Sequence, residues 1–468
     1  MLLKSKVILR LNEYNSRANP SIQAKELLSE TTHEYLGIAG SPTFLNLAKD
    51  LVFGSLSSSL QKNVASIQTV SGTGANHLAA TFLARHLRPN RVFISAPTWI
   101  NHRSIWEMAG VTVAEYPYYS PDTKSVDIEG MLAALDRAEP NDIVILQAFA
   151  HNPTGVDLSK DQWVQVADFV CRKKKLFVVF DSAYQGFASG DVDGDAWAVR
   201  HFAATIIDCP ETQHAGLGMC VAQSFSKNFG LYGERVGALH LVVPAHLSAQ
   251  GARGELMAIA RAEYSNPPRF GASIVETVLG DPVLRSQWEA DLDTMSSRMR
   301  RMRCALRKRL EKETGQDWFH VEMQIGMFSY TGLNKEQVSR LRDEFHVYLL
   351  PSGRLSVCGL NDENVEYVTH AVGQVMKTYG YSIEAIHELA IHRALPYTRC
   401  QDPQDKDQPI ENDILPNLNI WSFCPNCLDQ SQLKCLYVCN GQRALFYVFF
   451  NTKDFLSLHV YLQYQSLL

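Results

Sequence analysis

Short apolar runs alternate with longer amphipathic stretches from Ser66 onward. Apolar runs of roughly four to eight residues, bounded by polar or turn residues, are typical of strands buried on both faces of a sheet. The pattern predicts buried strands over 66–70, 91–95, 142–147, 176–179 and 236–243, separated by helical stretches such as 75–87. Strands that alternate with helices favour an α/β fold, in which a mainly parallel sheet lies between two layers of helices.

The second half of the chain has a different pattern. Residues 270–313 form one long helical pattern, and its basic end is most simply a solvated face. A strand over 321–330, a helix over 335–345 and a short strand over 355–358 follow. The chain of 468 residues is also too long for one ordinary core. We therefore expect a smaller α+β domain, joined to the first by the long helix.

Composition restricts the class of protein. A hydrophobic content of 46% and a charged content of 20% are typical of a soluble globular chain, and the net charge of -5 gives no reason to expect nucleic acid as a partner. No stretch is apolar enough to span a bilayer, and the first ten residues carry too many charges for a signal peptide. We expect a cytoplasmic protein without a membrane partner.

Ten cysteines are present, and half of them lie in the last 69 residues. Cys424, Cys427, Cys435 and Cys439 suggest a zinc site, but the second pair is spaced by three and the loop between the pairs is short. We expect neither a bound metal nor a disulfide framework.

The most informative stretch runs from Ser224 to Arg235 and contains Lys227. An amine can form a Schiff base with an aldehyde, and hydroxyl and guanidinium groups bind phosphate. Asp181 follows an apolar run that predicts a buried strand, and the carboxyl ends of such strands are where open α/β sheets bind ligands. Ser71-Gly72-Thr73-Gly74 opens a predicted helix, where free backbone N–H groups favour a phosphate.

Together with His151-Asn152-Pro153-Thr154-Gly155, these stretches resemble the aspartate aminotransferase family of pyridoxal-phosphate enzymes, from about Tyr35 to about Tyr379. The resemblance implies a fold-type I chain, active as a homodimer with shared active sites, and bound pyridoxal 5'-phosphate. It also implies four regions, namely a partial N-terminal segment 1–34 with a helix over 21–31, a large cofactor-binding domain 35–290, a small domain 291–385, and an unmatched tail 386–468 that we expect to be poorly ordered.

The resemblance assigns a role to each matching residue. Lys227 would carry the cofactor and move the substrate proton, Asp181 would hold the pyridine nitrogen, and Tyr184 with Asn152 would contact the phenolic oxygen. Trp99 would lie on the face of the pyridine ring, and His102 would lie behind Asp181. The phosphate would be held by Ser71, Gly72, Thr73, Ser224, Arg235 and Tyr35 of the neighbouring subunit.

The same resemblance suggests the substrates. Arg354 matches the arginine that binds the α-carboxylate, and Arg261 matches the one that binds a side-chain carboxylate from across the dimer. Trp99 and Asn152 would also line the substrate site. These matches imply transamination between a dicarboxylic amino acid, aspartate or glutamate, and a 2-oxo acid, 2-oxoglutarate or oxaloacetate.

Several alternatives stay open from the sequence. The residues also have structural interpretations, such as a packed loop tyrosine for Tyr35, a core tryptophan for Trp99 and an exposed helical arginine for Arg261. The chain departs from the family pattern at Gln147, where many members have histidine, and nothing recognisable matches the segment that normally closes over the substrate. An aminotransferase of broader or aromatic specificity, a lyase or decarboxylase of the same fold, and a catalytically impaired homologue therefore remain.

Overall fold

The computed structural model describes residues 33–54, 62–170, 176–208, 218–243 and 248–377, together with four strands in the last part of the chain. The chain forms two compact units, Met1–Gly380 and Tyr381–Leu468. The helix expected over 21–31 lies outside the described residues, as do the side chains of the four cysteines considered as zinc ligands. Among the helices that are described, none is long and apolar enough to cross a membrane.

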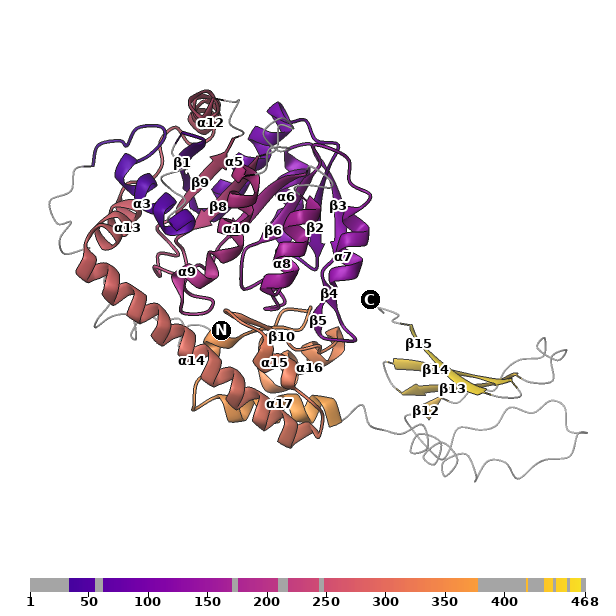
Figure 1. Ribbon diagram of the computed structural model, residues 1–468. Coiled ribbons are helices and arrows are strands. Elements are labelled where there is room, and N and C mark those ends of the chain that lie inside the picture. The colour runs from indigo at the N-terminus through magenta and orange to yellow at the C-terminus, as the bar shows by residue number, and fades with distance from the viewer. Residues whose placement is uncertain are drawn as a thin grey trace, which may run out of the picture. The chain divides into compact units, whose positions relative to one another are not determined.

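A seven-stranded sheet forms the centre of the first unit (Figure 1). Its strand order is β1 (Val64–Val70), β9 (Val236–Val242), β8 (Met219–Ser224), β7 (Phe177–Ser182), β6 (Ile143–Gln147), β2 (Arg91–Ala96) and β3 (Thr112–Pro117). Strand β9 runs antiparallel to both of its neighbours, and every other neighbouring pair in this sheet is parallel.

Helices cover both faces of this sheet. Along β7, Val178 and Phe180 belong to one hydrophobic core, whereas Phe177 and Val179 belong to another, so the strand is buried on both sides. The first core includes residues of α7 (Ile128–Leu135), α8 (Lys160–Ala167) and α10 (Trp197–Asp208). The second includes residues of α5 (Ser71–His86), α6 (Ile100–Met108) and α12 (Ala249–Glu263). The expected α/β fold with a mainly parallel sheet is confirmed.

Shorter elements complete this part of the unit. They are α3 (Pro42–Phe53), α9 (Val192–Asp195), and the hairpin of β4 (Tyr119–Ser120) and β5 (Ser125–Val126).

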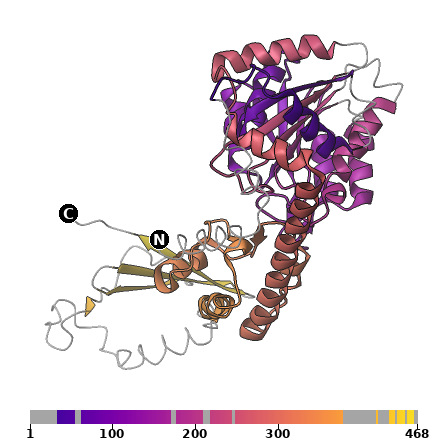
Figure 2. The ribbon, with the colours of Figure 1, turned by 90° about the vertical axis from the view of Figure 1, so that its left-hand side faces the viewer.

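The helical pattern over 270–313 is interrupted, which corrects the prediction of one long helix. It forms α13 (Phe270–Gly280) and α14 (Pro282–Thr314), with Asp281 between them in an extended conformation. Pro282 has no N–H to continue a helix from α13. The Asp281 carboxylate accepts hydrogen bonds from the N–H groups of Val283, at 2.8 Å, and Leu284, at 3.0 Å, and so starts a new helix. Figure 2 shows α14 as the long helix that leads to the smaller elements.

The smaller elements pack on α14 and share a hydrophobic core with it. They are α15 (Phe319–Met323), β10 (Phe328–Tyr330), α16 (Lys335–Phe345), β11 (Arg354–Ser356), the 3-10 turn Val357–Gly359 and α17 (Val365–Lys377). Strands β10 and β11 pair antiparallel.

The prediction of one strand over 321–330 is wrong for its first part, which is helix α15 and a turn. The Gln324 side chain binds both the N–H and the C=O of Tyr330, at 3.0 and 3.1 Å. Gly326 has a φ of +79°, a left-handed conformation that favours glycine. The chain therefore folds back at this point, and only Phe328–Tyr330 pairs as a strand.

The second unit contains an antiparallel sheet in the order β12 (Leu418–Asn419), β13 (Leu433–Asn440), β14 (Arg443–Thr452) and β15 (Phe455–Gln463). The expectation that the tail over 386–468 is poorly ordered stays a prediction. Aromatic and β-branched residues are frequent in β13 and β14, and these residue types favour strands.

Candidate active site

Most of the predicted site residues follow the carboxyl ends of parallel strands in the central sheet. Asp181 is at the end of β7, Lys227 follows β8, Asn152 follows β6, and Trp99 and His102 follow β2. Parallel strands place their carboxyl ends at one edge of a sheet, so residues far apart in the sequence meet there.

Asp181 is buried and hydrogen-bonded at both of its oxygens. Oδ1 accepts from Nδ2 of Asn76 at 3.4 Å, and Oδ2 lies 3.1 Å from Nε2 of His102. The other ring nitrogen of His102 lies 2.8 Å from the Thr98 hydroxyl, and the indole of Trp99 lies against the same imidazole, with ring centres 5.2 Å apart. Within the described ranges, no lysine or arginine lies within 4.0 Å of the Asp181 carboxylate. A buried carboxylate without a cationic side chain suits a protonated ring nitrogen as its partner.

Lys227 lies beside Tyr184, with Nζ 4.9 Å from the centre of the phenol ring. Burial lowers the pKa of the Lys227 amine from its ordinary value, the Asp181 charge opposes that shift, and the Arg235 charge adds to it. A lowered pKa increases the neutral fraction of the amine, which is the form that attacks a carbonyl or accepts a proton.

Tyr184, Asn152 and Arg354 form a connected group opposite this lysine. Burial and the Asp181 charge raise the pKa of the Tyr184 phenol, whereas the Arg354 charge and a side-chain hydrogen bond with Asn152 lower it. Arg354 Nη1 donates to Oδ1 of Asn152 at 2.7 Å, and its guanidinium carbon lies 4.0 Å from the centre of the Phe328 ring.

Arg354 has no acidic partner in the part of the chain that the structure describes. Burial lowers the pKa of its guanidinium. A planar, partly desolvated guanidinium without a carboxylate is well suited to bind a substrate carboxylate through two hydrogen bonds.

A second set of polar groups meets where α5 begins. Arg235 Nη2 donates to the Ser71 hydroxyl, and Nη1 lies 3.5 Å from the Ser226 hydroxyl. The N-cap residue of α5, Val70, makes no side-chain hydrogen bond to the helix. In the first turn, the Ser71 N–H donates to the Arg235 carbonyl at 3.0 Å and the Thr73 N–H donates to the Ser71 hydroxyl at 3.3 Å. A helix start still favours an anion through its dipole.

Gly72 and Ser71 have the backbone that this arrangement needs. A Cβ on Gly72 would lie 2.8 Å from Cβ of Ser224, so only glycine lets the two segments approach. Ser71 has a φ of +66°, an unusual conformation for a non-glycine residue, and its N–H bonds to the Arg235 carbonyl at 3.0 Å. The local backbone is therefore organised around the meeting point of Ser71 and Arg235.

Two predicted residues lie away from this group in a single chain. Tyr35 is 85% exposed, and Arg261 is exposed on α12, where its side chain donates to the Ser265 hydroxyl at 3.0 Å. The structure does not bring either residue to the side chains described above.

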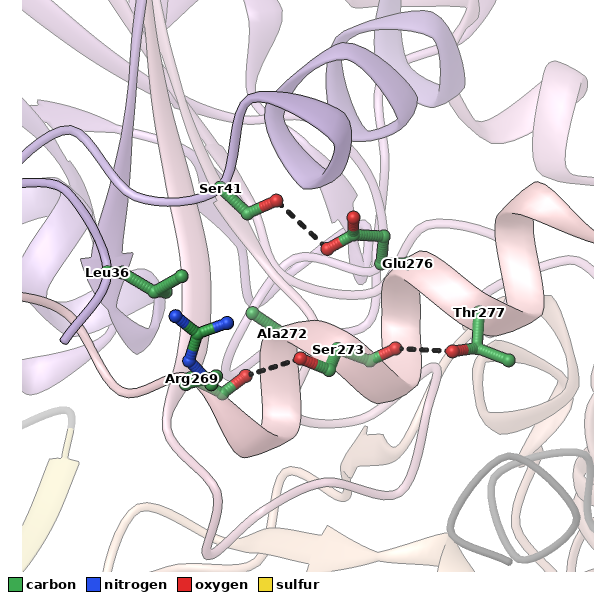
Figure 3. Close-up of a pocket in the computed structure, with 7 residues that line it drawn as sticks. All are labelled: Leu36, Ser41, Arg269, Ala272, Ser273, Glu276 and Thr277. Carbon is green, nitrogen blue, oxygen red and sulfur yellow. Dashed lines mark hydrogen bonds between the residues drawn. The ribbon is translucent and has the colours of Figure 1, made fainter. Parts of the chain in front are cut away.

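A separate cavity of about 260 Å³ lies between the start of α3 and helix α13 (Figure 3). Its lining residues are Leu36, Ser41, Arg269, Ala272, Ser273, Glu276 and Thr277. The Ser41 hydroxyl donates to Glu276 at 2.9 Å, and Thr277 donates to the Ser273 carbonyl at 2.8 Å, so several of the polar groups bind one another. None of these residues was predicted as a site residue.

Sequence reasoning did not assign Asn76, Thr98 and Ser226, which contact Asp181, His102 and Arg235. Each of the three lies inside or next to one of the sequence motifs described above, and this closeness in sequence is the signal that could have identified them.

Comparisons with known proteins agree with the geometry. The model of the family described as "Aminotransferase class I and II" matches residues 4–372. The chain belongs to this family. It is 43% identical over 376 residues to the cytoplasmic aspartate aminotransferase of Saccharomyces cerevisiae, covering 78% of this chain and 88% of the yeast protein.

Two solved structures extend the comparison. The structure of the yeast cytoplasmic enzyme superposes with a TM-score of 0.74, covering 78% of this chain and 89% of the yeast chain at 43% identity. An aromatic-amino-acid aminotransferase from Burkholderia pseudomallei, covalently bound to pyridoxal phosphate, has a TM-score of 0.70 at 39% identity, with coverages of 76% and 87%. The chain is therefore an aminotransferase, and enzymes of this family depend on pyridoxal phosphate.

The side chains present fit that cofactor. Lys227 is a half-buried amine with a lowered pKa, and Asp181 is a buried carboxylate without a lysine or arginine partner in the described ranges. Arg235 contacts the hydroxyl groups of Ser71 and Ser226 at the start of helix α5. These are the three kinds of group that an aldehyde, a basic ring nitrogen and a phosphate require.

Proposed function

We propose that this enzyme transfers the amino group of aspartate or glutamate to 2-oxoglutarate or oxaloacetate, with pyridoxal phosphate bound at Lys227. The observation that carries the proposal is the guanidinium of Arg354, which has no acidic partner among the described residues and donates a hydrogen bond to Asn152 near Tyr184. Relatives named aspartate aminotransferase in yeast, Caenorhabditis elegans and rice support the same substrates. They do not favour an enzyme of broader or aromatic specificity.

The cofactor would supply an electron sink for the electron pair that remains when the α-proton of the amino acid is removed. Lys227 would take that proton from the substrate α-carbon, since its lowered pKa increases the fraction of the amine that is neutral and can accept a proton. Asp181 would keep a proton on the ring nitrogen, and the hydrogen bonds from Asn76 and His102 hold its carboxylate in place.

The remaining groups would bind and orient. Tyr184 and Asn152 would hold the phenolic oxygen of the cofactor, and Trp99 would lie on the ring face. The phosphate would be bound by Ser71, Gly72, Thr73, Ser224 and Arg235, as the contacts between Arg235 and Ser71 support.

The exposed positions of Tyr35 and Arg261 support a homodimer in which each subunit completes the other's site. Tyr35 would reach the partner's phosphate group, and Arg261 would bind the side-chain carboxylate of a substrate held by the partner. We also propose a cytoplasmic location, as in the yeast relative, although mitochondrial relatives are similarly close.

Reduction of the purified holoenzyme with borohydride, followed by digestion and mass spectrometry, tests the cofactor assignment. Reduction fixes pyridoxal phosphate to its lysine, so the pyridoxyl mass should appear on the peptide that contains Lys227. Lys312, a solvent-exposed lysine on α14, serves as the internal control and should be unmodified. A pyridoxyl group found only on other lysines would overturn the assignment.

A further inference from the structure

Gln147 occupies the last position of β6, is buried, and lies between the two groups that would hold opposite sides of the cofactor. It binds the backbone of Asn152 on one side and faces Thr98 on the other. We infer that Gln147 is a positioning residue that sets the direction of a hydrogen-bond chain running through Thr98 and His102 to Asp181. The effect of Gln147 on catalysis rests on the proposed function, whereas the hydrogen-bond geometry does not.

The backbone of Asn152 fixes which way the Gln147 amide points. The Asn152 N–H is only a donor, and it lies 2.8 Å from Oε1 of Gln147. The Asn152 carbonyl is only an acceptor, and it lies 3.0 Å from Nε2. A reversed amide would place two donors together and two acceptors together, so a single orientation satisfies the buried groups.

That orientation determines what the Thr98 hydroxyl can do. The Nε2 atom of Gln147 lies 3.5 Å from Oγ1 of Thr98. An amide NH₂ group is a hydrogen-bond donor and not an acceptor, so Thr98 cannot donate to it. The His102 Nδ1 atom lies 2.8 Å from the same oxygen. The Thr98 hydrogen is therefore directed to Nδ1, which must accept it without a proton of its own.

The other end of the imidazole agrees with this direction. Nε2 of His102 lies 3.1 Å from the Asp181 carboxylate, which accepts hydrogen bonds and so requires the proton on Nε2. His151 is another ionisable group near His102, and burial lowers its pKa well below the ordinary value, with a smaller contribution from His102. His102 thus presents one N–H to Asp181, and the carboxylate accepts it.

Gln147 therefore links the two arms of the site. The Gln147 amide binds the backbone of Asn152, whose side chain contacts Arg354 and Tyr184. Through Thr98, the same amide also influences where the proton lies on the His102 ring beside Asp181. A histidine, which many family members have here, can turn either a donor or an acceptor toward Thr98, whereas the glutamine amide leaves one choice.

Nitrogen-15 NMR of the holoenzyme labelled at histidine tests this inference. His102 is identified by the signal lost in His102→Asn. In the native enzyme its Nδ1 shift should be that of an unprotonated imidazole nitrogen and its Nε2 shift that of a protonated one. Gln147→Met keeps the size of the side chain but removes the amide, so the Thr98 hydroxyl can rotate and accept a hydrogen bond from Nδ1. His102 can then hold a second proton, and the Nδ1 shift should move toward the protonated value while Nε2 stays protonated. Gln165→Met, at an exposed position on α8, is the matched control and should leave both shifts unchanged.

Kinetics give a second readout. Gln147→Met should lower kcat about 10- to 100-fold with little change in KM, because Gln147 would support groups around the cofactor without touching the substrate. If Gln147→Met does not fold, Thr98→Val removes the donor to Nδ1 and should shift the same signal.

A proton on Nδ1 in the native enzyme would overturn the inference, and so would an Nδ1 shift that neither Gln147→Met nor Thr98→Val changes. If the NMR shifts are as expected but the protein has no transaminase activity, the hydrogen-bond chain is supported and the proposed function is refuted.

Discussion

Arg354 and Asn152, separated by 202 positions in the sequence, are joined by a 2.7 Å hydrogen bond between Nη1 and Oδ1. Arg354 starts β11 of the smaller elements, whereas Asn152 follows β6 of the central sheet. The bond therefore holds Arg354, the side chain that we propose binds the substrate carboxylate, beside the groups that would hold the cofactor.

Arg354→Ala should lower kcat/KM for all amino acids, since all of them have an α-carboxylate. The loss of a partly desolvated charged contact costs roughly 2 to 5 kcal/mol, which is about 30- to 5000-fold in kcat/KM. Steady-state assays with aspartate, glutamate and phenylalanine measure it. Arg342→Ala, at an exposed position on α16, is the control and should change none of them. A loss confined to dicarboxylic substrates would contradict this role.

Arg261→Ala should act selectively, because only aspartate and glutamate have a second carboxylate for it to bind. We expect kcat/KM for these two to fall by about 10² or more, with a much smaller change for alanine and phenylalanine. Arg253→Ala, also exposed on α12, is the matched control. Equal losses for aspartate and phenylalanine would show that Arg261 is not the side-chain selector.

Mixing two impaired variants should restore activity if the sites are shared between subunits. A hybrid dimer of Lys227→Ala and Arg261→Ala chains has one site with the lysine of one chain and the arginine of the other. Random reassortment should give about one quarter of the native aspartate activity, because half of the dimers are hybrids with one complete site each. The assay follows the mixture after subunit exchange. Activity that never exceeds the average of the two variants would argue against shared sites.

Asp195 should make stability depend on pH. Its Oδ2 accepts from the N–H groups of Gly186, at 2.8 Å, and Ser189, at 3.4 Å, in the loop that follows Tyr184. Burial raises the pKa of this carboxyl to about 7, although those hydrogen bonds oppose the shift. The folded chain thus binds a proton that the unfolded chain has released between about pH 4 and 7, so the stability contributed by Asp195 falls as pH rises through this window.

Asp195→Asn should remove that dependence and keep the hydrogen bonds, because one amide oxygen can accept both. The free energy of unfolding of the native protein relative to the variant should fall by on the order of 1 to 3 kcal/mol from pH 5 to pH 8, measured by urea denaturation. Asp122→Asn, at an exposed position, is the control. A difference that is the same at both pH values would contradict the assignment.

The parts of the fold that follow from local patterns were predictable. Strands β2, β6, β7 and β9 are continuous apolar runs, and the residues that follow their ends are placed by the sheet itself. Asp181 was therefore predictable at the carboxyl edge of the sheet. Lys227 follows β8, a strand that the sequence analysis did not predict, so its place in the site was implied only by its motif and by the family resemblance.

The missed features depend on side chains that bind the backbone at a distance. Asp281 starts a new helix inside a continuous helical pattern, and Gln324 folds the chain back before β10. The contact of Asn76 with Asp181 crosses 105 positions, and no periodicity in the sequence signals it. The roles of Tyr35 and Arg261 depend on a second subunit, so they stay predictions.

Transfer of nitrogen-15 from labelled aspartate to 2-oxoglutarate by the purified enzyme tests the central claim most directly. The account predicts labelled glutamate and an equal amount of oxaloacetate, and it predicts that Lys227→Ala reduces this transfer by several orders of magnitude. A native enzyme that holds pyridoxal phosphate but transfers no label from aspartate, or a Lys227→Ala variant that transfers it at the native rate, would contradict the account.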